Sequence, residues 1–211
     1  LTIDPNNRLL WRMPRKRLEA ESLRDAILAV SGQLDRTIGG SEAGEILYNE
    51  AQVIDAERGF AANRVQTDHD CYNLPRRSIY LPVVRNALPD VLALFDVADG
   101  YSVTAVRNET TVPSQSLFML NNPLVRRQAR HFATSLPQRP DASDRQRLET
   151  AYLRALGRQP SEVELADAED FLARYVTASQ SSDRSAEEGR LAAWQSFCQM
   201  LFCLNEFLYL E

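Results

Sequence analysis

Residues 194–210 read Trp-Gln-Ser-Phe-Cys-Gln-Met-Leu-Phe-Cys-Leu-Asn-Glu-Phe-Leu-Tyr-Leu, and their apolar side chains fall on every side of a helical projection. A helix that is apolar all round has to be covered by other elements. The stretch is too short, and too often interrupted by polar residues, to be a membrane span. We therefore predict that a helix over 190–209 is the buried centre of an irregular helical bundle.

Length and composition indicate an ordinary globular domain. The 211 residues are 44% hydrophobic and 25% charged, which is sufficient for a core of their own. The net charge of −5 argues against a general affinity for nucleic acid. Because the chain begins at Leu1 and has no recognisable signal segment, we expect residues 1–211 to be a single α-helical domain from a larger protein.

The three cysteines, Cys71, Cys198 and Cys203, form no C-x-x-C pair, so the sequence has no haem-attachment or zinc-ribbon motif. Cys198 and Cys203 lie five residues apart on the predicted central helix and point to different sides of it. We expect both to be buried, inert thiols.

Apolar residues recur at helical spacing along much of the chain. Together with the positions of proline and glycine, this spacing predicts helices over 14–31, 42–58, 89–95, 113–120, 123–136, 144–156 and 161–176. Residues 41–73 are interpreted as a variable insertion or loop region. We predict at most a small β element near 76–84, with 101–106 as a candidate for a second short strand. The predicted fold class is therefore mostly α.

Residues 144–176 carry the clearest supersecondary signal. Gly157 ends one helix, and Ser161 with Glu164 forms a capping box that begins the next. This pattern predicts an αα-hairpin. The second helix is rich in acidic residues, which a phosphate backbone would repel, so we exclude a DNA-binding helix-turn-helix.

Several short motifs follow one another in order along the chain: Asn7–Arg12, Arg17–Asp25, Arg76–Pro82, Arg85–Asn86, Thr110–Gln115, Leu120–Asn121, Leu156–Arg158 and Leu204–Phe207. Through them the chain resembles the planctomycete-type cytochrome-associated C-terminal domain of unknown function. In that family the domain ends large secreted proteins that also carry a cytochrome c-like module. Two departures stand out: the chain starts partway into the family's domain, and residues 41–73 match nothing in it.

The resemblance implies an extracytoplasmic setting, periplasmic or secreted, and a multidomain parent. It implies haem only in other modules of that parent, and no cofactor in this chain. It implies no activity.

A set of arginines near the start of the chain is the first candidate ligand site. It comprises Arg8, Arg12, Arg17 and Arg24, with Asp25 beside them, and Arg77 and Arg85 as further candidates. Arg17 and Arg24 are two turns apart on the predicted helix, so they would share a face and grip a carboxylated or sulfated ligand. The favoured interpretation is an ion-pair network that ties this helix to Glu206 or to the 76–86 segment.

Asn205 and Glu206 are polar residues within the most apolar stretch of the chain. A carboxylate there must either be paired or carry a raised pKa, and a raised pKa is what a general acid requires. Glu206 is therefore a weak catalytic candidate. No second carboxylate stands at a readable spacing from it, so a glycosidase-type pair cannot be argued. Structural pairing is the favoured interpretation, because burying an unpaired charge is costly.

Asp68, His69 and Asp70 have metal-ligand side chains in a row, followed by Cys71. Adjacent residues rarely converge on one ion without further ligands, so a solvated loop is the favoured interpretation and no metal is expected. The sequence also has no Gly-x-Ser-x-Gly motif and no phosphate-binding glycine loop.

These observations favour a non-catalytic interaction or scaffold domain of a secreted, cytochrome-associated protein. Its expected partners are other modules of the parent chain or an extracellular polymer, with neither nucleic acid nor membrane insertion. The alternative is an enzyme or binding domain that acts on an anionic extracellular polysaccharide, with Glu206 as the acid and the arginines as substrate clamps.

Overall fold

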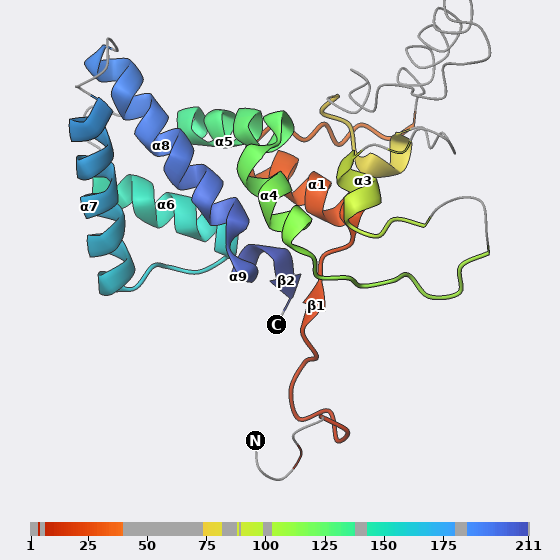
Figure 1. Ribbon diagram of the computed structural model, residues 1–211. Coiled ribbons are helices and arrows are strands. Elements are labelled where there is room, and N and C mark those ends of the chain that lie inside the picture. The colour runs from red at the N-terminus through yellow and green to blue at the C-terminus, as the bar shows by residue number, and fades with distance from the viewer. Residues whose placement is uncertain are drawn as a thin grey trace, which may run out of the picture.

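The computed structural model describes residues 4, 7–39, 74–81, 88, 90–98, 103–137, 143–179 and 185–210, and it is mostly helical (Figure 1). The predicted mostly α fold class is confirmed. The predicted helix over 42–58 and the whole 41–73 region lie outside the described residues, as does Cys71.

The helices are α1 (Ala20–Val30), α3 (Asp90–Leu94), α4 (Pro113–Asn121), α5 (Pro123–Ser135), α6 (Asp144–Leu156), α7 (Glu162–Ser179), α8 (Ala186–Cys203) and α9 (Asn205–Leu208). A short 3-10 turn, η3, covers Ser78–Tyr80. Two strands, β1 (Lys16–Arg17) and β2 (Tyr209–Leu210), pair antiparallel and join the segment before α1 to the C-terminal end of the described chain.

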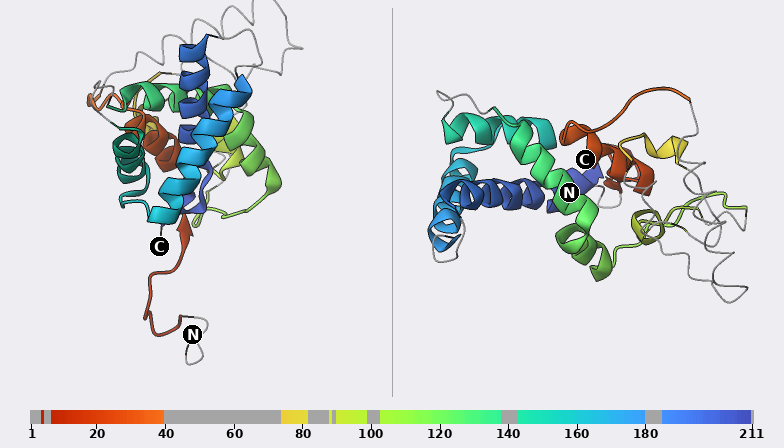
Figure 2. Two further views of the ribbon diagram at one scale, coloured as in Figure 1. Left: turned by 90° about the vertical axis from the view of Figure 1, so that its left-hand side faces the viewer. Right: turned by 90° about the horizontal axis from the view of Figure 1, so that it is seen from above.

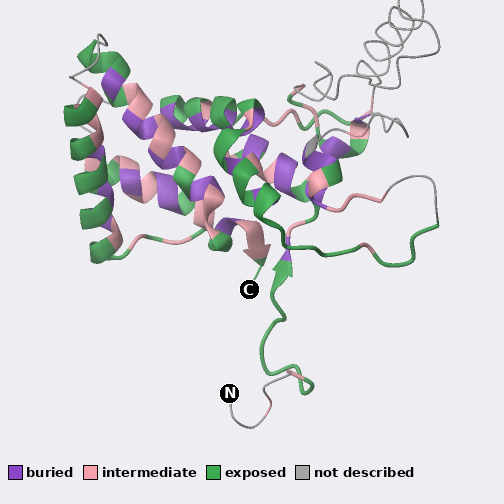
Figure 3. Ribbon diagram, viewed as in Figure 1, coloured by how far each residue is buried: buried purple, intermediate pink, exposed green. Residues whose placement is uncertain are grey.

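Helix α8 is the centre of the bundle, as the sequence predicts. It contacts α4, α5, α6, α7 and α9, and its middle turns bury Trp194, Phe197, Cys198 and Leu201. The exposed residues of α8 are concentrated in its first turns (Figure 3). The helix is therefore covered along its second half, where the sequence is apolar on all sides.

The central helix ends earlier than predicted. Leu204 has an extended backbone, with φ −70° and ψ 143°, so α8 stops at Cys203 and a single turn, α9, follows. This break turns the chain back on itself, and the Phe207 ring lies 5.1 Å from the Phe202 ring, centroid to centroid. The one helix predicted over 190–209 is thus two helices and the start of a strand.

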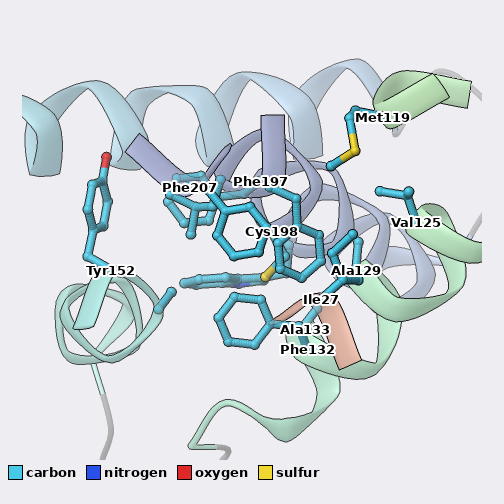
Figure 4. Packing of buried hydrophobic residues seen from close by; sticks show 14 of the residues in the cluster. Ile27, Met119, Val125, Ala129, Phe132, Ala133, Tyr152, Phe197, Cys198 and Phe207 are labelled. Carbon is cyan, nitrogen blue, oxygen red and sulfur yellow. The ribbon is translucent and has the colours of Figure 1, made fainter. Parts of the chain in front are cut away.

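Aromatic side chains from four helices meet around α8. Phe132 of α5 stacks on Phe202 at 5.8 Å, and Tyr152 of α6 lies 6.1 Å from Phe197. Figure 4 shows Phe132 and Phe197 on either side of Cys198, which is fully buried, and Tyr152 farther out on α6. The buried residues form one cluster that runs from α1 to α9, so the helices share a continuous core.

Local signals fix most helix ends. Gly157 adopts the left-handed conformation (φ 71°) that glycine favours and ends α6. Ser161 and Glu164 form the predicted capping box, with the Ser161 hydroxyl accepting from the Glu164 amide at 3.3 Å. Asn122 accepts from the Leu124 amide at 2.8 Å, so Asn122 and Pro123 separate α4 from α5.

The β structure lies elsewhere than the sequence suggests. In the described part of 76–84, Arg76 makes only an isolated bridge with Asp35, and the 3-10 turn follows. Residues 103–106 form no strand. The two-stranded sheet instead uses Lys16–Arg17, and for this reason α1 begins at Ala20 and not at residue 14.

Candidate interaction surface

Arg17 anchors the point at which the N-terminal segment leaves the bundle. Its backbone pairs with Tyr209 of β2, and its side chain is 6% exposed. One guanidinium nitrogen donates to Asp96 Oδ2 at 2.7 Å and to the Phe95 carbonyl at 3.3 Å, and the other donates to the Thr110 carbonyl. Arg17 thus joins β1 to the residues after α3 and before α4.

Asp96 completes this network. Its carboxylate accepts from the Thr110 amide at 2.8 Å and from the Thr110 hydroxyl at 2.9 Å, in addition to Arg17. Burial acts to raise the pKa of Asp96, but the hydrogen bonds from Thr110 and Arg17 outweigh it, so the pKa lies below its usual value. We use the term Arg17 network for the group formed by Arg17, Phe95, Asp96 and Thr110.

Two segments project from the bundle at this network. The N-terminal arm, residues 7–15, extends away from the helices in Figure 1 and in the left-hand view of Figure 2. The projecting loop, residues 103–109, bulges from the same end of the molecule. Arg107 ties this loop to α1 through Glu21, with nitrogen–oxygen distances of 2.7 and 2.9 Å.

The N-terminal arm exposes large apolar side chains. The exposed fractions are 77% for Leu9, 75% for Leu10, 53% for Trp11 and 60% for Met13. Single exposed apolar residues are common on soluble proteins, but a run of four on one projecting segment is typical of a surface that contacts another molecule.

The arm is folded at its tip and not merely extended. The Asp4 carboxylate accepts from the Leu9 amide at 2.7 Å, and the Asp4 carbonyl accepts from the Trp11 indole at 3.1 Å. Asn7 and Arg12 bond to each other through the Asn7 side chain and the Arg12 backbone. Leu10 has φ 53°, a conformation that disfavours most side chains. The apolar side chains are therefore presented by an ordered turn.

A shallow apolar groove of about 640 Å³ lies between α3 and α4, next to the Arg17 network. Leu94 and Phe118 line it, together with Leu117, which is 58% exposed. Gln115, at the start of α4, donates to the Leu94 carbonyl at 3.0 Å and holds the two helices together. The groove adds apolar surface at the end of the molecule from which the loop projects.

The predicted arginine clamp is not assembled. Arg24 is fully buried on α1, where it donates to the Leu74 and Arg76 carbonyls at 2.6 and 2.9 Å and to the Ser78 hydroxyl at 3.2 Å. Asp25 accepts from the Ser78 amide at 2.8 Å. Arg17 lies on β1 and not on the helix, so the two arginines do not share a helix face.

Glu206 lies in an environment different from the expected one. It is exposed on α9, and both of its carboxylate oxygens accept from Arg158, at 2.6 and 2.8 Å. Arg158 also pairs with Glu164 at 2.7 and 2.9 Å, and with Ser161 it holds the pKa of Glu164 at about 2. Glu206 is thus ion-paired, but at the surface and with an arginine outside the predicted set.

The remaining candidates are dispersed. Arg8, Arg12 and Arg77 are exposed, and Arg12 stacks over the Trp11 ring of the arm at 5.3 Å. Arg85 and the Asp68–Asp70 run lie outside the described residues. Among the residues that the structure does describe, no cluster of three or more His, Cys, Asp or Glu side chains is placed to hold a metal ion.

Sequence reasoning missed Asp96, and it noted Thr110 and Arg158 only as parts of short motifs. Asp96 and Thr110 are 14 residues apart and meet Arg17 only through tertiary structure, so no spacing reveals them. Arg158 had a usable signal: it follows Gly157 directly and precedes the capping box at Ser161, a position from which a side chain reaches the first turn of the next helix.

In the part of the chain that the structure describes, no helix has both the length and the apolar character needed to cross a membrane. The family model described as PSD1, a protein of unknown function (DUF1553), matches residues 1–172. No curated protein and no solved structure matches this chain.

Proposed function

Because this chain belongs to the DUF1553 family of proteins of unknown function, we propose from its own geometry that it is a non-catalytic interaction domain. The N-terminal arm is the docking element, and its partner is another module of the same parent protein. On this proposal the chain holds modules together and carries out no chemistry of its own.

The observation that carries the proposal is the ordered, apolar tip of the arm. Leu9, Leu10 and Trp11 are exposed although the turn that presents them is hydrogen-bonded internally. An ordered turn loses little conformational entropy when it binds, and tryptophan is among the residues that contribute most at protein interfaces. Such a tip suits a preformed apolar pocket on another protein better than it suits a polysaccharide.

The charge of the arm indicates what kind of partner surface it would bind. Arg8, Arg12, Arg15 and Lys16 follow one another closely, whereas the chain as a whole has a net charge of −5. A partner surface with an apolar centre and an acidic rim would complement this segment, and the rim would act mainly on the association rate.

The wider setting of the proposal comes from the resemblance to the planctomycete-type cytochrome-associated domains. It supports an extracytoplasmic parent protein with a cytochrome c-like module, in which haem belongs to that module and not to this chain. The arm would then fix this domain against a neighbouring module of that parent.

An enzymatic role for Glu206 has less support. A general acid must carry a proton and face a substrate cleft. Glu206 instead accepts from Arg158 with both of its carboxylate oxygens, at 2.6 and 2.8 Å, and it lines neither the groove between α3 and α4 nor the one between α5, α7 and α8.

The experiment is a calorimetric titration of this chain against the remaining modules of the parent, expressed as a separate chain. The double substitution Leu9→Ser and Trp11→Ser is expected to weaken binding by roughly tenfold or more, with no change in Tm, because the arm lies outside the core. Leu153→Ser is the matched control, because Leu153 is 51% exposed on α6.

Wild-type affinity in the arm variant would refute docking through the arm. A large drop in Tm would show instead that the arm stabilises its own domain.

A further inference from the structure

A second groove, of about 400 Å³, lies between α5, α7 and α8, on elements distinct from those that carry the N-terminal arm. Its walls are mostly polar, and two of the residues that line it, Arg126 and Arg130, come from α5. They are four residues apart and both are exposed, so their side chains rise from the same face of the helix.

Helix α5 differs in charge from the rest of the chain. Its sequence, PLVRRQARHFATS, contains three arginines and no acidic residue, within a protein of net charge −5. In the described part of the chain neither Arg126 nor Arg130 has an acidic partner, whereas Arg145, Arg158 and Arg174 are all paired. Two neighbouring guanidinium groups are thus left to bind an anion from outside.

The one carboxylate in the groove is already engaged. Glu188 of α8 accepts from the Ser185 amide at 3.0 Å and from the Ser185 hydroxyl at 2.9 Å, as the second half of a capping box. It is therefore held at the beginning of α8 by its own helix. Glu188 keeps its negative charge, but the two arginines outnumber it, so these three side chains give the groove a net positive charge.

Two glutamines on α8 supply acceptors beside the arginines. Gln195 donates its amide nitrogen to the Arg126 carbonyl at 3.3 Å, and Gln199 donates to the Met119 and Leu120 carbonyls at 3.0 and 2.7 Å. These bonds fix the orientation of both amides, and each side-chain oxygen is then left to accept a hydrogen bond. Hydroxyl groups are suitable donors to such oxygens.

The groove also contains Ser196, with a hydroxyl group, and Tyr175 of α7, whose ring lies 6.0 Å from Phe171 at a tilt of 53°. Guanidinium groups pair with a carboxylate, amide oxygens accept from hydroxyls, and an aromatic ring offers an apolar face. A carboxylated sugar meets all three requirements within one residue of polymer. An acidic peptide meets the first but does not bring the hydroxyl groups.

We propose that the groove between α5, α7 and α8 binds a carboxylated glycan, with Arg126 and Arg130 gripping a uronate carboxylate. This inference is independent of the docking of the arm, because it uses no residue of the arm, and it extends to a ligand that the arm does not explain. It describes binding only and assigns no reaction.

The test is a calorimetric titration with tetragalacturonate, with the methyl-esterified tetramer and with tetraglutamate as the comparison ligands. We expect the free acid to bind and its ester to bind roughly tenfold more weakly, because esterification removes the charge that the arginines recognise. The double substitution Arg126→Gln and Arg130→Gln should weaken binding of the free acid by a similar factor or more.

The matched control is Arg36→Gln with Arg77→Gln, which removes the same charge from two exposed arginines outside the groove. It should bind tetragalacturonate as the wild type does, and both double variants should keep the wild-type Tm. If the two double variants lost affinity for tetragalacturonate equally, the loss would come from net charge alone, and the proposed site would be wrong. Failure of the wild type to bind, or equal affinity for tetraglutamate, would overturn the glycan assignment.

Discussion

Arg24 and Arg158 each bond to several oxygen atoms, but they lie in opposite environments. Arg24 is fully buried, and the acceptors of its guanidinium include two main-chain carbonyls and one hydroxyl. The Arg158 side chain is 39% exposed and pairs with two carboxylates, those of Glu164 and Glu206. Judged by formal charge alone, the interactions of Arg158 should stabilise the fold more than those of Arg24.

Burial reverses that order. Water can replace Arg158 as a partner of its two carboxylates, so the net value of the surface pairs is small. The Arg24 side chain is fully buried, and its Ser78 acceptor lies in a buried position, so removing this side chain would leave acceptors that have poor access to water without their donor. Arg24 also has an acidic neighbour, because Asp25 Oδ1 lies 3.6 Å from one of its guanidinium nitrogens. The buried arginine should be the more important one for folding, and the following experiments test this.

Arg24→Met should have the largest effect. It keeps much of the side-chain volume but leaves the Leu74 and Arg76 carbonyls without their donor, and we expect a loss of about 3–5 kcal/mol in the free energy of unfolding. Urea denaturation measures it directly. Arg36→Met, at an exposed position, serves as the control and should change stability by less than about 0.5 kcal/mol. Equal effects in the two variants would contradict the importance of burial.

Arg17→Met should come second. Arg17 is nearly as buried as Arg24. The substitution removes the donor to Asp96 and to the carbonyls of Phe95 and Thr110, and we expect it to lower the free energy of unfolding by about 2–3 kcal/mol. The acceptors lie at the base of the projecting loop, where partial rearrangement can bring water to them. The Thr110 amide donates a hydrogen bond to Asp96. Its hydrogen exchange should accelerate in this variant more than the exchange of the backbone amides in α8. Uniform acceleration would mean that the network stabilises the whole fold.

The Arg17 network should also make stability depend on pH. The folded pKa of Asp96 lies below its ordinary value of 3.8, so its contribution is present above about pH 3.8 and is lost as the pH falls through the folded value. Asp96→Asn should flatten the acid limb of a stability–pH curve and lower stability at pH 7. A variant curve with the wild-type slope below pH 4 would show that Asp96 is not linked to folding.

The sequence was sufficient for most helices because their ends are marked locally. Asn122 with Pro123, Gly157 and the Ser161 capping box each act within a few residues. Even the burial of Arg24 has a local signal. It stands with Ala20, Leu23, Ile27 and Leu28 on the buried face of α1, at a position that a hydrophobic residue would normally occupy.

The sites were harder to predict because tertiary contacts set them. The break at Leu204 occurs at a residue with no conformational restriction of its own, yet it moves Glu206 from the expected buried helix to the surface. The pairing of Arg17 with Tyr209 joins positions at opposite ends of the chain, and it removes Arg17 from the helix on which a shared face with Arg24 was expected. Neither effect can be predicted from the periodicity of apolar residues along the chain.

The smallest effect is expected for Glu206→Gln, and it is the sharpest test of the comparison. Because the Glu206 side chain is 40% exposed and Arg158 keeps Glu164, the loss in unfolding free energy should be about 0.5–1 kcal/mol. A double-mutant cycle with Arg158→Met should give a coupling energy of the same size, and it should shrink in 1 M salt because exposed charges are screened. A loss as large as that of Arg24→Met, in a pair with both side chains about 40% exposed, would mean that partner charge and not burial ranks the two arginines.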